Sequence, residues 1–114
     1  PEAVSLDEFV SSLEGALGGP VVKVWPFGAP SVRRVGIVSG GGGAFSDQAA
    51  AAGVDVYVTG EVNHNVYHQA RELGLNVVYG GHYATETAGL KALADHLGAY
   101  LGLDTVFLDL PTGA

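Results

Sequence analysis

A chain of 114 residues with 47% apolar side chains fits one compact domain with a buried core, which argues against a disordered segment. Twelve acidic residues outnumber five basic ones, so we expect no nucleic-acid partner and no membrane surface as partner. The absence of cysteine excludes disulfide bonds, thiolate metal sites and cysteine nucleophiles. No apolar run approaches the roughly 20 residues that cross a bilayer, and no signal peptide is visible, so we expect a cytoplasmic protein.

The first third of the chain begins with an amphipathic helix. Ser5 and Glu8 have the spacing of a capping box, and a pair of glycines follows residue 17, which predicts a helix over residues 5–17. Its apolar stripe has helical spacing and consists of Leu6, Phe9, Val10, Leu13 and Leu17. A short strand is expected at residues 21–25, followed by a loop at residues 26–30.

From residue 34 onward, apolar runs of strand length alternate with segments of helical pattern. The strands are expected at residues 34–39, 54–59, 75–79 and 105–110, and the helices at residues 46–52, 63–73 and 85–101. Ser46 and Asn63 are the expected N-caps of the first two helices, and Gly53 and Gly74 are their expected ends. The alternation predicts a single α/β domain over residues 1–114, with a mainly parallel sheet flanked by helices.

The carboxyl ends of parallel strands meet at one edge of a sheet, so three loops are expected to gather there. These loops span residues 39–45, 59–65 and 80–86. Their polar side chains are Ser39, Thr59, Glu61, His64, His82, Thr85 and Glu86. The sequence therefore predicts that its polar chemistry converges on one rim of the sheet.

His82 and Glu86 are the most informative pair on this rim. Residues four apart share one face of a helix, so the imidazole and the carboxylate can reach a common point. They follow a strand and two glycines, where α/β sheets bind ligands, which makes them a candidate half-site for a metal ion. The alternative is a surface pair that contributes a few tenths of a kcal/mol.

The glycine run at residues 40–43 has two interpretations. Its backbone amides could cradle a phosphate at a helix N-terminus, in which case Gly41 and Gly42 would line the ligand cavity. The run lacks the Lys-Ser/Thr ending of a P-loop and fits the dinucleotide fingerprint poorly. The alternative is a tight turn that needs small residues.

Three further residues have a metal interpretation and a structural one. Glu61 and His64 lie near the rim and could extend a metal site, but a carboxylate there is also explained by the dipole of the following helix. His68 is four residues after His64, yet packing on the helix flank is the favoured interpretation. His96 lies deep in the last helix and is expected on the surface.

Four stretches, together with their order along the chain, resemble a known family. They are residues 34–42, residues 53–61 ending in Thr-Gly-Glu, residues 81–86 (Gly-His-Tyr-Ala-Thr-Glu) and residues 103–111. The chain is similar to the family of GTP cyclohydrolase 1 type 2 homologs, also called the NIF-three-like family (NGG-interacting factor three). The resemblance covers essentially the whole chain and implies one lobe of the two-lobed NIF-three-like fold.

The resemblance implies a hydrolase-like protein with a dinuclear metal site between two lobes of a ring-shaped homohexamer. His82 and Glu86 match metal ligands of the family, and Glu86 would bridge the two ions. Thr59, Glu61 and His64 match positions beside the cavity. Two divalent ions per full-length subunit are implied, with zinc, manganese and iron not distinguished, and the family's name implies a nucleotide, GTP, as the substrate.

The chain also departs from the family. Members are roughly twice as long, and their N-terminal half carries a His-His pair and a later Asp that complete the site. This chain has no His-His pair, begins at Pro1 and contains no methionine, so we expect the C-terminal part of a longer protein. Because a catalytic ion needs three or more protein ligands, we expect this part alone to bind metal weakly or not at all and to turn nothing over. The alternative function is a non-enzymatic metal-binding or assembly protein that acts as a ring, and a weaker third one is a nucleotide-binding module built on the glycine run.

Overall fold

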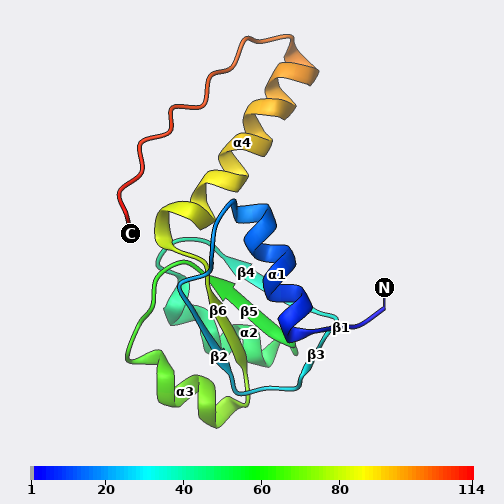
Figure 1. Cartoon of the computed structure of the whole chain (residues 1–114), viewed down its shortest axis with the longest axis vertical. Coiled ribbons are helices and arrows are strands. Elements are labelled where there is room, and N and C mark those ends of the chain that lie inside the picture. Colours follow the sequence, from blue (N-terminus) through cyan, green and yellow to red (C-terminus); the bar gives the residue numbers. More distant parts are fainter. Residues whose placement is uncertain (1) are drawn as a thin grey trace.

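The computed structural model describes residues 2–114, and its centre is a four-stranded sheet in the order β2-β6-β5-β4 (Figure 1). Strands β4 (Val35–Val38), β5 (Val56–Thr59) and β6 (Asn76–Tyr79) are parallel to one another. Strand β2 (Lys23–Pro26) pairs antiparallel with β6 at one edge. The mainly parallel α/β class predicted from the sequence is therefore confirmed.

Helices cover both faces of this sheet. Helix α1 (Leu6–Leu17) lies on one face, α2 (Ser46–Ala51) and α3 (Val66–Leu73) lie on the other, and α4 (His82–Leu101) follows β6. Successive side chains of a strand point to opposite faces, so Val56, Val58 and Val78 pack with α1, whereas Tyr57 and Val77 pack with α2 and α3. Helix α4 projects away from the sheet (Figure 1). None of the helices within residues 2–114 is long and apolar enough to cross a membrane.

Helix α1 begins and ends as its sequence predicts. The backbone N–H of Ser5 donates to Glu8 Oε2 at 2.8 Å, and the N–H of Glu8 donates to Ser5 Oγ at 3.2 Å. Gly18 ends the helix in the left-handed conformation, with φ of 78°. The strand just before the helix was not predicted: β1 (Val4–Ser5) pairs with β3 (Ser31–Val32).

The predicted N-caps of the next two helices are wrong. A 3-10 helix, η1 (Gly42–Phe45), leads directly into α2, so Phe45 occupies the cap position and Ser46 is already helical. The buried Ser46 hydroxyl donates instead to Gln69 Oε1 at 3.3 Å. Asn63 accepts a hydrogen bond from the N–H of Asn65 in the turn before α3, which begins three residues later than expected.

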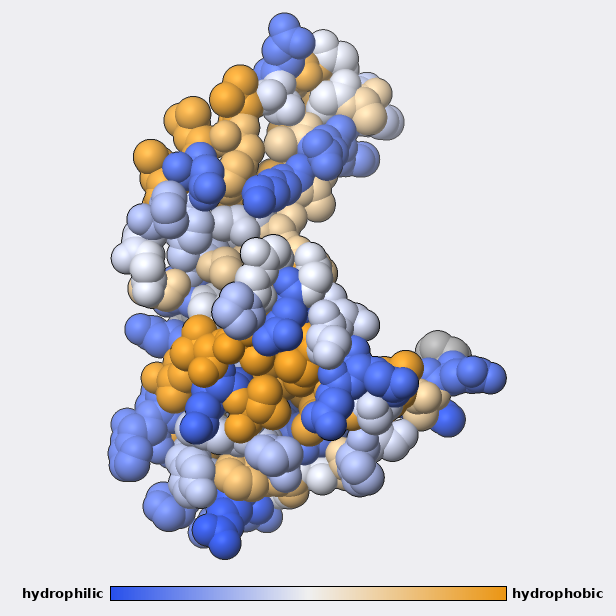
Figure 2. Space-filling model, in the orientation of Figure 1, coloured by the Kyte–Doolittle hydropathy of each residue, from blue (hydrophilic) through white to orange (hydrophobic). Residues whose placement is uncertain are grey.

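The predicted strand at residues 105–110 is also wrong. Residues 102–114, here called the tail, run as an extended segment beside α4 and pair with no strand among the described residues (Figure 1). The Tyr83 hydroxyl holds the tail, because it donates to Asp109 Oδ1 at 2.7 Å and accepts from the N–H of Leu110 at 2.8 Å. Figure 2 shows apolar side chains along this part of the molecule, and Val106 is 80% exposed. A β-rich run becomes a strand only where a neighbouring strand completes its hydrogen bonds.

Candidate functional site

The loops that follow β4, β5 and β6 lie side by side, as the parallel topology predicts. The N–H groups of Gly60 and Glu61 both donate to the carbonyl oxygen of Gly40 at 2.9 Å. The N–H of Gly81 in turn donates to the carbonyl oxygen of Gly60 at 3.0 Å. These backbone hydrogen bonds join the three loops into one rim.

Two threonines add side-chain bonds to this rim. Thr85 Oγ1 accepts from the N–H of Gly40 at 3.0 Å and donates to the carbonyl oxygen of Gly81 at 2.8 Å. Thr59 Oγ1 donates to the carbonyl oxygen of Gly40 at 3.3 Å and is fully buried beneath the glycine run. Both hydroxyls therefore hold the loops together.

The glycine run approaches its neighbours too closely for a side chain. Gly40 has φ of 64°, and a Cβ there would lie 2.5 Å from Glu86 Oε1 and 3.1 Å from His82 Nε2. A Cβ on Gly42 would lie 2.7 Å from Thr59 Oγ1. Close approach to the rim's own side chains thus accounts for the glycines at positions 40 and 42.

Two buried tyrosines lie behind the rim, and no sequence motif predicts where their hydroxyl groups lie. The Tyr57 hydroxyl donates to the carbonyl oxygen of Gly42, so the strand fixes the glycine run from below. Burial raises the pKa of Tyr57, and it raises the pKa of Tyr79 to about 12. The Tyr79 hydroxyl has no partner of hydrogen-bond geometry, although the nearby Asn63 backbone lowers its pKa slightly. Both phenols stay protonated near neutral pH and supply no general base.

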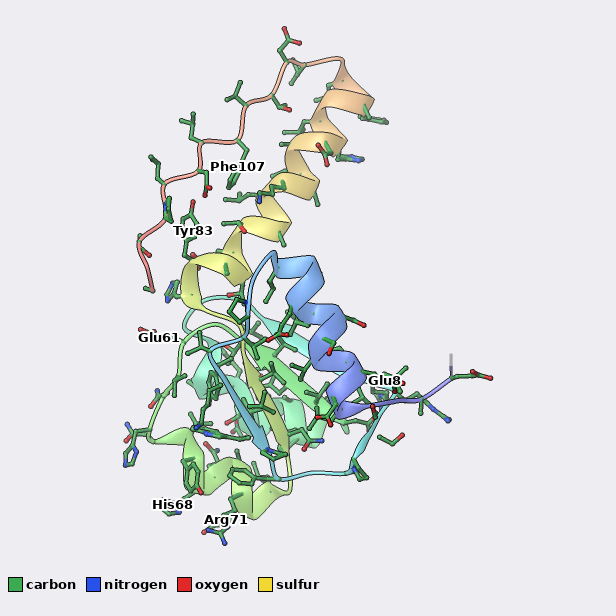
Figure 3. All side chains as sticks on the ribbon, viewed as in Figure 1. Glu8, Glu61, His68, Arg71, Tyr83 and Phe107 are labelled. Atoms are coloured by element: carbon green, nitrogen blue, oxygen red, sulfur yellow. The ribbon has the colours of Figure 1, made fainter. Side chains whose placement is uncertain are left out.

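The imidazole of His82 lies between two carboxylates that come from different elements. Its Nδ1 is 3.6 Å from Glu61 Oε2, on the loop after β5, and its Nε2 is 3.4 Å from Glu86 Oε1, one helical turn along α4. The three side chains are 39%, 63% and 51% exposed for His82, Glu61 and Glu86. Figure 3 shows Glu61 on the side of the molecule where α4 begins. The site is an open rim rather than an enclosed cavity.

The separation of His82 Nε2 and Glu86 Oε1 suits two ligands of one ion. Two donors at about 2.1 Å from a tetrahedral ion lie roughly 3.4 Å apart, which matches the observed 3.4 Å. Within residues 2–114, however, no group of three or more His, Asp or Glu side chains has an arrangement that could hold a metal ion. The pair therefore has the geometry of a half-site.

The other three histidines form no ion pair with a carboxylate in the part of the chain that the structure describes. His64 is exposed in the turn before α3, and its carbonyl oxygen accepts from the N–H of Tyr67 at 3.1 Å. His68 is exposed on α3, edge-on to the ring of Tyr67, and Figure 3 shows it far from Glu61. His96 stacks on Tyr100 with ring centroids 5.6 Å apart. No pair of these histidines forms a second ligand cluster among the described residues.

Known proteins are similar to this chain over nearly its whole length. Residues 1–112 match the family model described as Duf34/NIF3 (NGG1p interacting factor 3). A GTP cyclohydrolase 1 type 2 homolog of Treponema pallidum is 44% identical over 110 residues, and the aligned part is 96% of this chain and 38% of the relative. The homolog of Deinococcus radiodurans is 38% identical over 99% of this chain and 43% of its own length.

Solved structures are also similar to this chain. TTHA1606 from Thermus thermophilus superimposes with a TM-score of 0.87 at 42% identity, covering 99% of this chain and 45% of that one. Reduced HcgD from Methanocaldococcus jannaschii is more distant, with a TM-score of 0.73 at 29% identity over 88% of this chain and 41% of that one. The chain thus spans less than half the length of these relatives. On the family match and these similarities, the chain belongs to the DUF34/NIF3 family.

Proposed function

We propose that this chain is the metal-binding part of a hydrolase-like DUF34/NIF3 protein, in which His82 Nε2 and Glu86 Oε1 bind one divalent ion. The observation that carries the proposal is their 3.4 Å separation, which is the distance expected between two ligands of one ion. Gly40 supports it, because a Cβ there would lie 2.5 Å from Glu86 Oε1 and 3.1 Å from His82 Nε2 and would displace the pair. Imidazole and carboxylate together suit zinc, manganese or iron.

A complete site needs more than these two side chains. A catalytic ion takes three or more protein ligands and keeps one position open. We therefore propose that further ligands come from the part of the relatives' length that this chain does not span, and that Glu86 would also help to hold a second ion there. In that arrangement the protein would be a ring-shaped hexamer with the ions between two lobes.

The role of the chain's own residues is to hold the proposed ligands in place rather than to transfer protons. Helix α4 holds His82 and Glu86 one turn apart, and Thr85 fixes the start of that helix to Gly40. The bound ions would supply a hydroxide by lowering the pKa of a coordinated water. The name of the relatives, GTP cyclohydrolase 1 type 2 homolog, makes a guanine nucleotide the first substrate to test.

Metal titration of the chain and of matched variants tests the ligand pair. Weak zinc binding is expected, and His82→Ala and Glu86→Ala should each weaken it more than about tenfold. His68→Ala is the control, because this exposed histidine lies on α3 away from the rim. Manganese should broaden the amide NMR signals around residue 82 selectively. Unchanged affinities in both rim variants would remove the pair from the ligand set.

The openness of the rim favours a second candidate, a metal-binding or assembly protein without catalysis. Side chains that are 39–63% exposed do not exclude water around a substrate. The two functions are separated by incubating the full-length protein with GTP and each metal and following the guanine chromophore. Loss of the chromophore supports the hydrolase, whereas no change with any metal supports the second candidate.

A further inference from the structure

Glu61 is the one carboxylate of the rim that does not share a helix with His82. Its backbone N–H donates to the carbonyl oxygen of Gly40 at 2.9 Å, which fixes its place on the rim. Helix α3 begins only at Val66, with Asn65 at the cap position. The field of a helix terminus falls off within its first turn. The dipole interpretation of Glu61 therefore loses its basis, and the carboxylate needs another explanation.

The imidazole of His82 presents a different nitrogen to each carboxylate. Nδ1 faces Glu61 Oε2 at 3.6 Å, and Nε2 faces Glu86 Oε1 at 3.4 Å. A neutral imidazole carries one N–H and one lone pair, and a carboxylate can only accept a hydrogen bond. One nitrogen can therefore donate to its carboxylate, and the other directs a lone pair toward a second negative group. That second arrangement is favourable only when a cation lies between them.

We infer that Glu61 holds the proton of His82 on Nδ1 and thereby leaves the lone pair of Nε2 directed at the ion. The inference rests on the proposed function, because it assumes that Nε2 and Glu86 bind the metal. Metal-ligating histidines generally donate their other ring N–H to such a partner, which orients the ring. Glu61 is thus a positioning residue and not a ligand.

The geometry fits this division of roles. A Cβ on Gly40 would lie 2.5 Å from Glu86 Oε1 and 3.1 Å from His82 Nε2, so the backbone packs tightly against this pair. A Cβ on Gly41, in contrast, would lie 3.4 Å from Glu61 Oε2, an ordinary contact. The 3.6 Å between Nδ1 and Glu61 is longer than a hydrogen bond. The Glu61 side chain is 63% exposed and free to shorten this distance once a metal fixes the ring. In the metal-free chain Glu61 and Glu86 compete for the ring proton at 3.6 and 3.4 Å, so the bias toward Nδ1–H should be clearest in Glu86→Ala, which removes the competing carboxylate.

Long-range ¹H–¹⁵N correlation spectra of histidine-labelled protein measure the tautomer directly. At about pH 9 an ordinary imidazole is neutral, so the two nitrogens report which one carries the proton. His68, exposed in the same sample, gives the reference ratio. In Glu86→Ala, His82 is expected to show more Nδ1–H than His68, and adding Glu61→Ala should return it to the reference ratio. Zinc affinity should fall about tenfold in Glu61→Ala alone, the range measured for partners of metal-bound histidines.

The variants separate failure of this inference from failure of the proposed function. If His82→Ala and Glu86→Ala bind zinc as the unmodified chain does, the proposed function is wrong, whatever the tautomer shows. If those variants lose zinc but His82 and His68 have the same tautomer ratio in Glu86→Ala, Glu61 does not position the ring. If Glu61→Ala loses zinc as completely as His82→Ala, with the tautomer unchanged, Glu61 is a ligand and the inference is wrong. Glu61→Gln keeps an acceptor at the same place and should retain most of the Nδ1–H bias.

Discussion

The two ends of the sheet differ in how completely their polar side chains are hydrogen-bonded. At the end where β5 and β6 begin, the fully buried Asn76 accepts from the N–H of Gly28 at 2.8 Å and donates to the carbonyl oxygens of Ala29 and Asp55 at 2.7 and 2.9 Å. At the end where these strands finish, His82 meets its two carboxylates only at 3.4 and 3.6 Å. Polar groups whose bonding is complete stabilise loops, whereas groups with free capacity are available to a ligand.

Asn76→Ala should give the largest loss of stability. Asn76 makes three hydrogen bonds at the end of the sheet where β5 and β6 begin, here called the saturated end. The substitution leaves three backbone groups without their partner, which should lower the free energy of unfolding by about 2–4 kcal/mol. Urea denaturation measures the change. Asn63→Ala is the matched control, since Asn63 is exposed and accepts one hydrogen bond, and should cost less than about 1 kcal/mol. Similar losses in the two variants would contradict the comparison.

Gly40→Ala should destabilise the chain by about 2–3 kcal/mol. The new Cβ combines a positive φ with a 2.5 Å approach to Glu86 Oε1. Gly18 has φ of 78°, and a Cβ there would meet nothing within 4 Å, so Gly18→Ala should cost only about 1 kcal/mol. The difference between the denaturation midpoints of the two variants measures the cost of the close contact with Glu86. Equal midpoints would show that the Glu86 side chain moves aside freely.

Asp55 makes the saturated end sensitive to acid. The N–H groups of Arg34 and Arg33 donate to its carboxylate at 2.7 and 2.8 Å and lower its pKa. A lowered pKa in the folded state contributes stability above the unfolded pKa of about 3.9, and this is lost as pH falls through the folded value. Asp55→Asn should therefore lose less stability between pH 7 and pH 3 than the unmodified chain. Asp104→Asn, in the exposed tail, should leave that difference unchanged.

His82→Ala should give the smallest effect on stability, less than about 0.5 kcal/mol. The ring is 39% exposed and its two carboxylate contacts lie at the surface. Zinc should nevertheless raise the melting temperature of the unmodified chain and not that of the variant. A stability loss comparable to that of Asn76→Ala would place His82 among the structural residues instead.

Much of this contrast follows from sequence patterns. The apolar runs that became β5 and β6, the capping box of Ser5 and the glycine ends identify the α/β layers, and parallel topology then predicts which loops meet. Spacing alone also pairs His82 with Glu86. These signals are local, and the right-handed crossovers of parallel strands then determine how the elements are arranged.

Other features depend on contacts between distant parts of the chain. Glu61 is far from His82 in the sequence, so its position against Nδ1 appears only when β5 and β6 pair. The Tyr57 hydroxyl under Gly42 and the bond from Ser46 to Gln69 have no local signature. The predicted strand at residues 105–110 is wrong for the opposite reason. Its local pattern is strong, but a strand also requires a neighbouring strand to pair with.

A single oxygen atom, the carbonyl oxygen of Gly40, joins the loop after β4 to the loop after β5. It accepts hydrogen bonds from the N–H groups of Gly60 and Glu61 and from the Thr59 hydroxyl. Loops usually exchange their amide hydrogens quickly, but these two amides should exchange as slowly as those of the central strands. Insertions directly beside Gly40 or Gly60 would displace both carboxylates and the imidazole at once, whereas extra residues near position 64 would leave them in place.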